Sequence, residues 1–181
     1  FNGNTTLSGA SPPVLYKLTI NSGKILTGPA SAAFGVAGNW INNGTFNHNS
    51  GTVNFTGSTT ISGLATTAFN NIFISSGNTL TGKLGDYFIV SGNWINNGTF
   101  MHNGGGVIFD GTTLISGATN TMFGSVIINN TRILTAPSSG TMSVALDFTN
   151  DGTFNNNGGT LTFNGTEQVL GGSSATLFEN I

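Results

Sequence analysis

The two histidines, His48 and His102, have the clearest capacity for chemistry, because imidazole binds metals and transfers protons near neutral pH. They occupy the same position in two copies of a sequence repeat, and Asn156 stands at that position in the third copy. No pattern of carboxylates accompanies them, whereas a metal site needs several converging ligands. We therefore expect a solvated polar pair, with no metal site and no bound cofactor.

The charged residues offer little material for catalysis. The four aspartates, Asp86, Asp110, Asp147 and Asp151, do not form the dense Asp-Gly nonapeptides that bind calcium. Arg132 is the only arginine, and no His or Asp recurs beside a Ser or Thr at a catalytic spacing. An active site needs a cluster of titratable groups with perturbed pKa values. The sequence therefore predicts a protein that is not an enzyme.

Composition excludes several classes of partner. The chain has 181 residues with four Lys and Arg, six Asp and Glu, no Cys, and a hydrophobic share of 37%. Four cations cannot form a basic patch, so a nucleic-acid or anionic-membrane partner is not expected. No apolar run is long enough to span a bilayer. Without Cys there is neither a disulfide framework nor a thiolate metal site.

The elements that would position any site are set by a sequence repeat of constant length. Residues 38–46 (GNWINNGTF) recur letter for letter at 92–100, and residues 148–154 (FTNDGTF) are a looser version. Self-similarity at a fixed period is the signature of a stacked repeat architecture. We expect one domain over 1–181, built from units 1–54, 55–108 and 109–162 and a partial unit 163–181.

Within a unit, apolar residues alternate in the way that strands require. Val53-x-Phe55, Ile72-x-Ile74 and Phe88-x-Val90 each place two side chains on one strand face. The spacing of these segments predicts three coils of about 18 residues per unit and about ten coils in all. The expected fold is all-β, a parallel β-solenoid. A helical solenoid is disfavoured because Gly, Asn and Thr dominate the composition.

Aromatic residues of matching phase are expected to stack as inward columns that form the core. In a β-solenoid, inward side chains of successive coils make one continuous core. The three columns are Phe1, Phe55, Phe109 and Phe163; Trp40, Trp94 and Phe148; and Phe46, Phe100 and Phe154.

Asn-Gly and Asp-Gly pairs are expected to form the corners of the coils. These pairs are Asn43-Gly44, Asn97-Gly98 and Asp151-Gly152. Asn, Asp and Gly tolerate a positive φ, so the pairs suit tight bends. The same pairs are a strong hairpin signal, and hairpins would build antiparallel blades as in a propeller. Three and a third blades would not close a ring, so the solenoid is favoured.

Three surface functions can be weighed from the residue pattern. Trp40 and Trp94 would stack on sugars if they pointed outward, but their shared phase with Phe148 favours the core. An ice-binding face needs a regular Thr-x-Thr ladder, and Thr79-x-Thr81 maps in the preceding unit to Ile25-x-Thr27, which breaks the array. N-glycosylation is a hypothesis at the Asn-x-Ser/Thr sequons. These sequons begin at Asn4, Asn43, Asn54, Asn97, Asn129 and Asn164.

The segment GNWINNGTFNHNSGTVNFTG (38–57) resembles repeats of large bacterial surface and secreted proteins of the filamentous-haemagglutinin-like adhesin type. Residues 92–111 and, more weakly, 146–165 carry the same resemblance, which covers essentially the whole chain. Its low-complexity motifs specify a fold rather than an activity. The resemblance implies a right-handed parallel β-helix displayed outside the cell.

These observations together predict a structural repeat protein. Both ends of the chain are ordinary repeat sequence, so we expect head-to-tail self-association or continuation in a longer chain. The expected function is the shaft of an extracellular filament, sheath or surface adhesin. The alternative is an adhesin module that recognises a glycan or a host cell surface.

Overall fold

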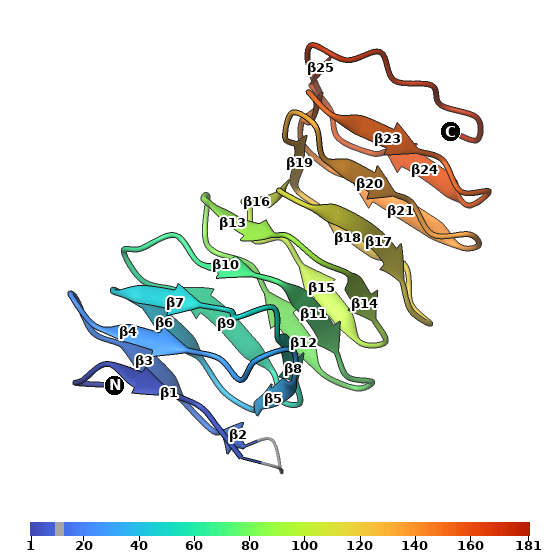
Figure 1. The fold of residues 1–181 in the computed structure, drawn as a ribbon. Helices are drawn as coiled ribbons and strands as arrows, with labels where there is room; N and C mark the ends of the chain where they lie inside the picture. The colour runs from blue at the N-terminus through green and yellow to red at the C-terminus, as the bar shows by residue number, and fades with distance from the viewer. Residues whose placement is uncertain (10–12) are drawn as a thin grey trace.

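The computed structural model describes residues 1–9 and 13–181, which form 25 short strands and no helix. The chain winds as a solenoid with three strands in each coil, and its two termini lie at opposite ends of the stack (Figure 1). Every third strand lies on the same side of the solenoid. We call the three sides faces A, B and C.

Face A begins with β1, and its strands form two successive sheets. Its strands are β1 (Thr5–Thr6), β4 (Ile25–Thr27), β7 (Thr45–Asn47), β10 (Ala68–Phe69), β13 (Tyr87–Val90), β16 (Gly106–Phe109), β19 (Ser125–Ile128), β22 (Phe148–Asn150) and β25 (Leu170–Gly171).

Face B is a single sheet of eight strands. Its strands are β2 (Val14–Leu15), β5 (Ala33–Val36), β8 (Thr52–Phe55), β11 (Asn71–Ile74), β14 (Trp94–Asn96), β17 (Thr112–Ser116), β20 (Ile133–Thr135) and β23 (Thr153–Asn155).

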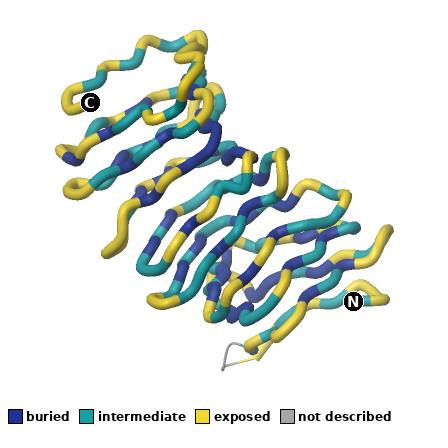
Figure 2. The backbone as a smooth tube through the Cα atoms, turned by 180° about the vertical axis from the view of Figure 1, so that it is seen from behind, coloured by how far each residue is buried: buried dark blue, intermediate teal, exposed yellow. Residues whose placement is uncertain are grey.

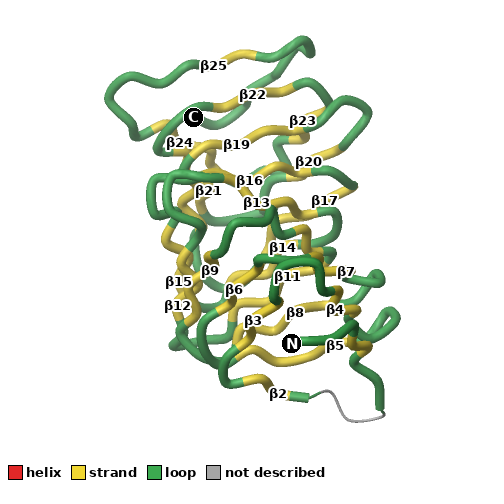
Figure 3. Tube along the Cα trace, turned by 90° about the vertical axis from the view of Figure 1, so that its left-hand side faces the viewer, coloured by secondary structure: helices red, strands yellow, loops and turns green. Residues whose placement is uncertain are grey.

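Face C again carries two sheets, of five strands and three strands. Its strands are β3 (Leu18–Ile20), β6 (Trp40–Asn42), β9 (Thr59–Ser62), β12 (Thr79–Thr81), β15 (Thr99–Met101), β18 (Thr121–Phe123), β21 (Thr141–Val144) and β24 (Thr160–Phe163). Viewed from the side, the strands of successive coils lie one above another (Figure 3).

All strand pairings among the described residues are parallel, so the predicted parallel β-solenoid is confirmed and the hairpin alternative is wrong. Strand partners lie one coil apart in the sequence: Val53 pairs with Ile72, and Ile72 with Trp94. The structure has about eight coils with a spacing of about 20 residues, slightly fewer and longer than predicted.

The sequence repeat and the coil have different lengths. One repeat contains eight strands, since β3, β11 and β19 occupy equivalent positions at 18–20, 71–74 and 125–128. Three strands make a coil, so each repeat covers two and two-thirds coils. Equivalent segments of successive repeats therefore move from face C to face B to face A. The predicted division of a repeat into three coils is wrong.

This mismatch also corrects the predicted aromatic columns. Trp40, Trp94 and Phe148 lie in β6, β14 and β22, on three different faces. The neighbours of Trp40 in its own sheet are Leu18 and Ile61. The strand residues of the other two predicted columns are distributed over the three faces in the same way, and Phe1 precedes the first strand. These two columns are Phe1, Phe55, Phe109 and Phe163, and Phe46, Phe100 and Phe154.

All ten of these aromatic side chains nevertheless belong to the interior. Eight are buried, and Phe1 and Phe163 are partly buried against the same continuous core. Each of the first two repeats places its rings edge to face, with centroid distances of 4.7 Å for Trp40–Phe46 and 4.8 Å for Trp94–Phe100. Edge-to-face pairs of this kind stabilise beyond their buried area. Buried residues alternate with intermediate or exposed residues along most strands, and exposed residues gather at the corners (Figure 2).

Candidate functional surface

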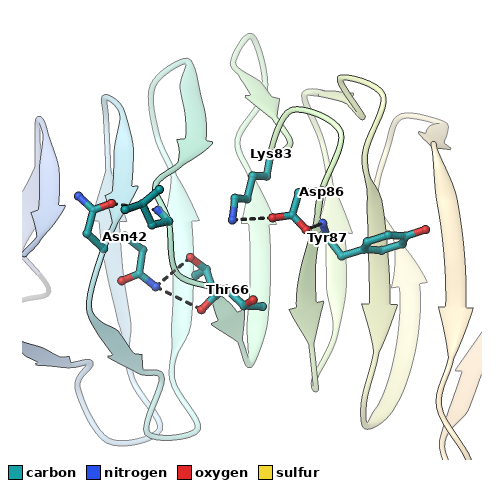
Figure 4. Close-up of polar contacts among 8 residues, drawn as sticks. Asn42, Thr66, Lys83, Asp86 and Tyr87 are labelled. Carbon is teal, nitrogen blue, oxygen red and sulfur yellow. Dashed lines mark hydrogen bonds and ion pairs between the residues drawn. The ribbon is translucent and has the colours of Figure 1, made fainter. Parts of the chain in front are cut away.

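The most distinctive polar feature is a set of three fully buried asparagines, Asn42, Asn96 and Asn150, at the ends of β6, β14 and β22. Asn42 Oδ1 accepts the Gly44 N–H at 3.1 Å. Its Nδ2 donates to the Thr66 carbonyl at 3.3 Å and to Thr67 Oγ1 at 3.2 Å in the next coil (Figure 4). The side chain thus ties its own corner to the corner of the following coil.

The same geometry recurs in the next two repeats. Asn96 accepts from Gly98 at 3.1 Å and donates to Thr121 Oγ1 at 3.1 Å. Asn150 accepts from Gly152 at 3.1 Å and donates to Thr176 Oγ1 at 2.9 Å. These three residues were not predicted from the sequence. One feature of the sequence could have indicated them. Asn stands two positions after the aromatic residue in all three repeats, although that residue is Trp40, Trp94 or Phe148.

The predicted corner residues form a second contact between coils. Asn43, Asn97 and Asp151 each use Oδ1 to accept a backbone N–H of the next coil, at 2.9 Å from Leu64, 2.8 Å from Ala118 and 2.8 Å from Ser173. Because only an oxygen acceptor is used, Asp replaces Asn without loss of the bond. The Ser173 backbone N–H, together with the Ser173 hydroxyl, lowers the pKa of Asp151.

The glycines at these corners are required by close contact rather than by a positive φ. A Cβ on Gly44, Gly98 or Gly152 would lie 2.4–2.5 Å from backbone oxygens of the preceding coil. None of the three has a positive φ, so the predicted reason for glycine at these corners is wrong. Positive φ occurs instead at Gly117 (φ 123°), where a Cβ would lie 2.1 Å from the Asn96 carbonyl oxygen.

The histidines occupy tight turns on different sides of the solenoid. His48 follows β7 on face A, and His102 follows β15 on face C. In each, Nδ1 accepts a backbone N–H two residues ahead, from Ser50 and Gly104, at 3.1 Å. Burial lowers the pKa of His48. Within 1–9 and 13–181 no group of three or more His, Cys, Asp or Glu side chains could hold a metal ion.

Two isolated ion pairs join charged side chains among the described residues. Lys83 Nζ lies 2.7 Å from Asp86 Oδ2, and this contact, with the Tyr87 backbone N–H, lowers the pKa of Asp86 (Figure 4). Arg132 Nε donates to Asp110 Oδ1 at 3.2 Å. These partly exposed pairs contribute little to stability. The structure does not bring the aspartates, the histidines and Arg132 together into one cluster.

The tryptophans do not form a sugar-binding platform. Trp40 and Trp94 are completely buried, so neither can stack on a ligand at the surface. Both indole Nε1–H groups are buried without an acceptor among the described residues. An unpaired buried donor carries a desolvation cost. The third repeat has Phe148 at this position, which removes the donor.

The threonine ladder is interrupted, although for a different reason from the one predicted. In the observed register Thr81 neighbours Thr60 and Met101, and Thr79 neighbours Thr99. The row of hydroxyls therefore ends at Met101, which is 54% exposed. Met101 and Met122 line a shallow apolar hollow with His102 between β15 and β18. On β9, β12 and β15 the hydroxyls therefore do not form a regular Thr-x-Thr ladder.

Several sequon asparagines are already engaged in the fold. Asn43 and Asn97 bridge coils as described, and Asn129 Nδ2 donates to Asp110 Oδ1 at 3.1 Å. Asn4 is exposed, and its Oδ1 accepts the Ile25 N–H at 3.0 Å. N-glycosylation of the six sequons remains a hypothesis.

Comparison with known proteins assigns no function to this surface. No family model, no curated protein and no solved structure matches the chain. Across 1–9 and 13–181, no helix has the length and hydrophobicity needed to cross a membrane. What the described surface offers is a nearly uncharged array of amides and hydroxyls on a repetitive parallel scaffold.

Proposed function

We propose that this chain is a non-enzymatic structural protein that forms the shaft of an extracellular filament, sheath or surface adhesin. The observation that carries the proposal is the parallel pairing of strands on all three faces along the length of the solenoid. Each coil is held to the next by backbone hydrogen bonds, by the buried asparagines and by one continuous core. Such a scaffold resists bending and extension along its axis.

The surface chemistry supports the same role. Only 6% of the residues are charged, and the polar surface consists mainly of amides and hydroxyls. These groups do not titrate between acidic and alkaline pH, and salt does not screen them. A rod with this surface keeps its interactions when the ionic conditions around it change. The low number of cations argues against a nucleic-acid partner.

The proposed location outside the cell depends on the resemblance to filamentous-haemagglutinin-like bacterial surface proteins, carried by residues 38–57 and 92–111. The parallel β-solenoid is the fold that this resemblance implies. Self-association, head to tail or as part of a longer chain, is proposed on the same basis.

Electron microscopy and fibre diffraction of purified material test this function. One sequence repeat covers two and two-thirds coils, so it should rise about 13 Å along the axis. Three repeats make eight whole coils, so the structure of a rod should repeat fully after about 38 Å. Uniform rods with this period are the expected result. Compact particles that never associate at any concentration would contradict head-to-tail assembly.

The alternative function, recognition of a glycan or host surface, depends on exposed aromatic side chains. With both tryptophans buried, Tyr16 (82% exposed) and the partly exposed Tyr87 are two candidates. Glycan-array binding that is lost in Tyr16→Ala or Tyr87→Ala, but kept in Thr60→Ala on another part of the surface, would favour this alternative. Uniform lack of binding would favour the shaft.

A further inference from the structure

The chain contains six Asn-Gly dipeptides, the sequence most prone to spontaneous deamidation. In this reaction the backbone nitrogen of Gly loses its proton to hydroxide and attacks the Asn side-chain Cγ. The new N–C bond closes a succinimide, and the side-chain amide leaves as ammonia. One water molecule then opens the ring to give Asp or isoAsp. The reaction needs a glycine N–H that is free to lose its proton.

The structure binds this N–H at four of the six dipeptides. At Asn43-Gly44 and Asn97-Gly98, the glycine N–H is donated to the fully buried Asn42 and Asn96 at 3.1 Å. At Asn103-Gly104 it is donated to His102 Nδ1 at 3.1 Å. At Asn164-Gly165 it is donated to Gln168 Oε1 at 2.8 Å.

Asn157-Gly158 lacks this protection. Both residues are exposed, and the Gly158 N–H has no acceptor within 1–9 and 13–181. Gly158 has a φ of 91° and lies in the loop between β23 and β24. The Gly3 N–H also has no acceptor in those ranges, so Asn2 shares this property.

We propose that Asn157 is a spontaneous deamidation site of the folded protein, and that Asn42 and Asn96 protect Asn43 and Asn97 by retaining the adjacent glycine N–H. At 42–44 and 96–98 the first Asn of the Asn-Asn-Gly motif therefore protects the motif chemically as well as forming a corner. The same motif at 156–158 has no bond of this kind among the described residues, so the protection comes from the fold and not from the motif alone. Before Gly44 or Gly98 can react, the corner must open locally and break its hydrogen bond. The need to break one such bond slows the reaction by about tenfold.

If Asn43 or Asn97 did deamidate, the two products, Asp and isoAsp, would affect the corner differently. Asp at position 43 or 97 keeps the oxygen acceptor, as Asp151 shows with its 2.8 Å bond to the Ser173 N–H. IsoAsp inserts a methylene into the backbone at a corner with little free space, where even a Cβ on Gly44 would lie 2.4 Å from the Asn21 carbonyl oxygen. Protection at these corners therefore preserves the stacking of coils, whereas the exposed loop at Asn157 tolerates the change.

Timed incubation of the full chain at mildly alkaline pH, followed by peptide mapping with mass spectrometry, tests the proposal. Asn157 should react about tenfold faster than Asn43 and Asn97 in the folded protein. In concentrated urea the three rates should converge, because each residue is followed by glycine. Equal rates in the folded protein, or a difference that persists in urea, would overturn the proposal.

A variant tests the protecting bond directly. His102→Ala releases the Gly104 N–H, so deamidation of Asn103 should rise about tenfold. Asn97 in the same molecule is the internal control, since its rate rises only if the fold is lost. An unchanged rate at Asn103 with Asn97 still protected would show that a retained N–H does not limit the reaction. If the variant unfolds, the wild-type comparison in buffer and urea still decides.

Discussion

Trp40 and Trp94 occupy the same position in successive sequence repeats, yet they lie on different faces of the solenoid. Trp40 pairs with Leu18 and Ile61 on face C, whereas Trp94 pairs with Ile72 and Ile115 on face B. A repeat of two and two-thirds coils explains this relationship. Because all three faces offer an inward position beside the same core, one motif satisfies each face in turn.

Disulfide trapping tests this register, since the chain has no cysteine of its own. Ile41 and Ser62 are partners in β6 and β9, within the Cα separation that a disulfide accepts. Ile41→Cys with Ser62→Cys should therefore oxidise to a disulfide within one chain. Ile41→Cys with Ile95→Cys is the matched control, which should stay reduced. Crosslinking of the control pair under dilute conditions would contradict the assignment of faces.

Loss of a buried asparagine should be costly. Asn96→Ala leaves the Gly98 N–H, the Asn120 carbonyl and Thr121 Oγ1 without their partner. The free energy of unfolding should fall by about 2–4 kcal/mol, as measured by urea denaturation. Asn97→Asp is the control and should change it by less than about 0.5 kcal/mol, because the third repeat already uses Asp151. Similar effects of the two variants would refute a structural role specific to Asn96.

Because its indole N–H has no acceptor among the described residues, Trp40 should tolerate substitution by Phe with little loss of stability. Trp40→Phe loses packing volume but also removes a buried donor without an acceptor among the described residues. The two effects should largely offset each other, leaving a change within about 1 kcal/mol in urea denaturation. Trp40→Ala has no such compensation and should cost about 3–5 kcal/mol. A large fall in the free energy of unfolding of Trp40→Phe would show that the indole N–H stabilises the fold, and would contradict this prediction.

The dependence of stability on pH should be weak and confined to acidic conditions. Burial lowers the pKa of His48, so the unfolded chain takes up more protons there than the folded chain. Stability from this group is complete above about pH 6.5 and declines as the pH falls below it. His48→Asn, which introduces the residue found at position 156, should remove this part of the decline in thermal melts.

The lowered pKa values of Asp86 and Asp151 affect a more acidic range. The stability that these carboxylates contribute is present above about pH 4 and is lost as the pH falls further. A decline that began above neutrality in the wild type, or that was unchanged near pH 6 in His48→Asn, would contradict these assignments.

The sequence alone determined the class of architecture and the residues of the core. Alternation in segments such as Ile72-x-Ile74 specifies strands, and recurrence of Phe and Trp at fixed intervals specifies which side chains face inward. The scarcity of charge and the absence of cysteine predict a protein without catalytic or metal-binding chemistry, and this stays a prediction. These conclusions follow from local patterns, which a linear sequence records completely.

Only the tertiary structure decided the coil length, the assignment of residues to faces and the role of the buried asparagines. The period of the sequence repeat is compatible with three coils of about 18 residues or with two and two-thirds coils of about 20 residues. The choice depends on hydrogen bonds between strands such as β6 and β9, which are remote in sequence. The hydrogen bond from Asn42 to Thr67 also joins two successive coils, so it can be identified only when the register between coils is known.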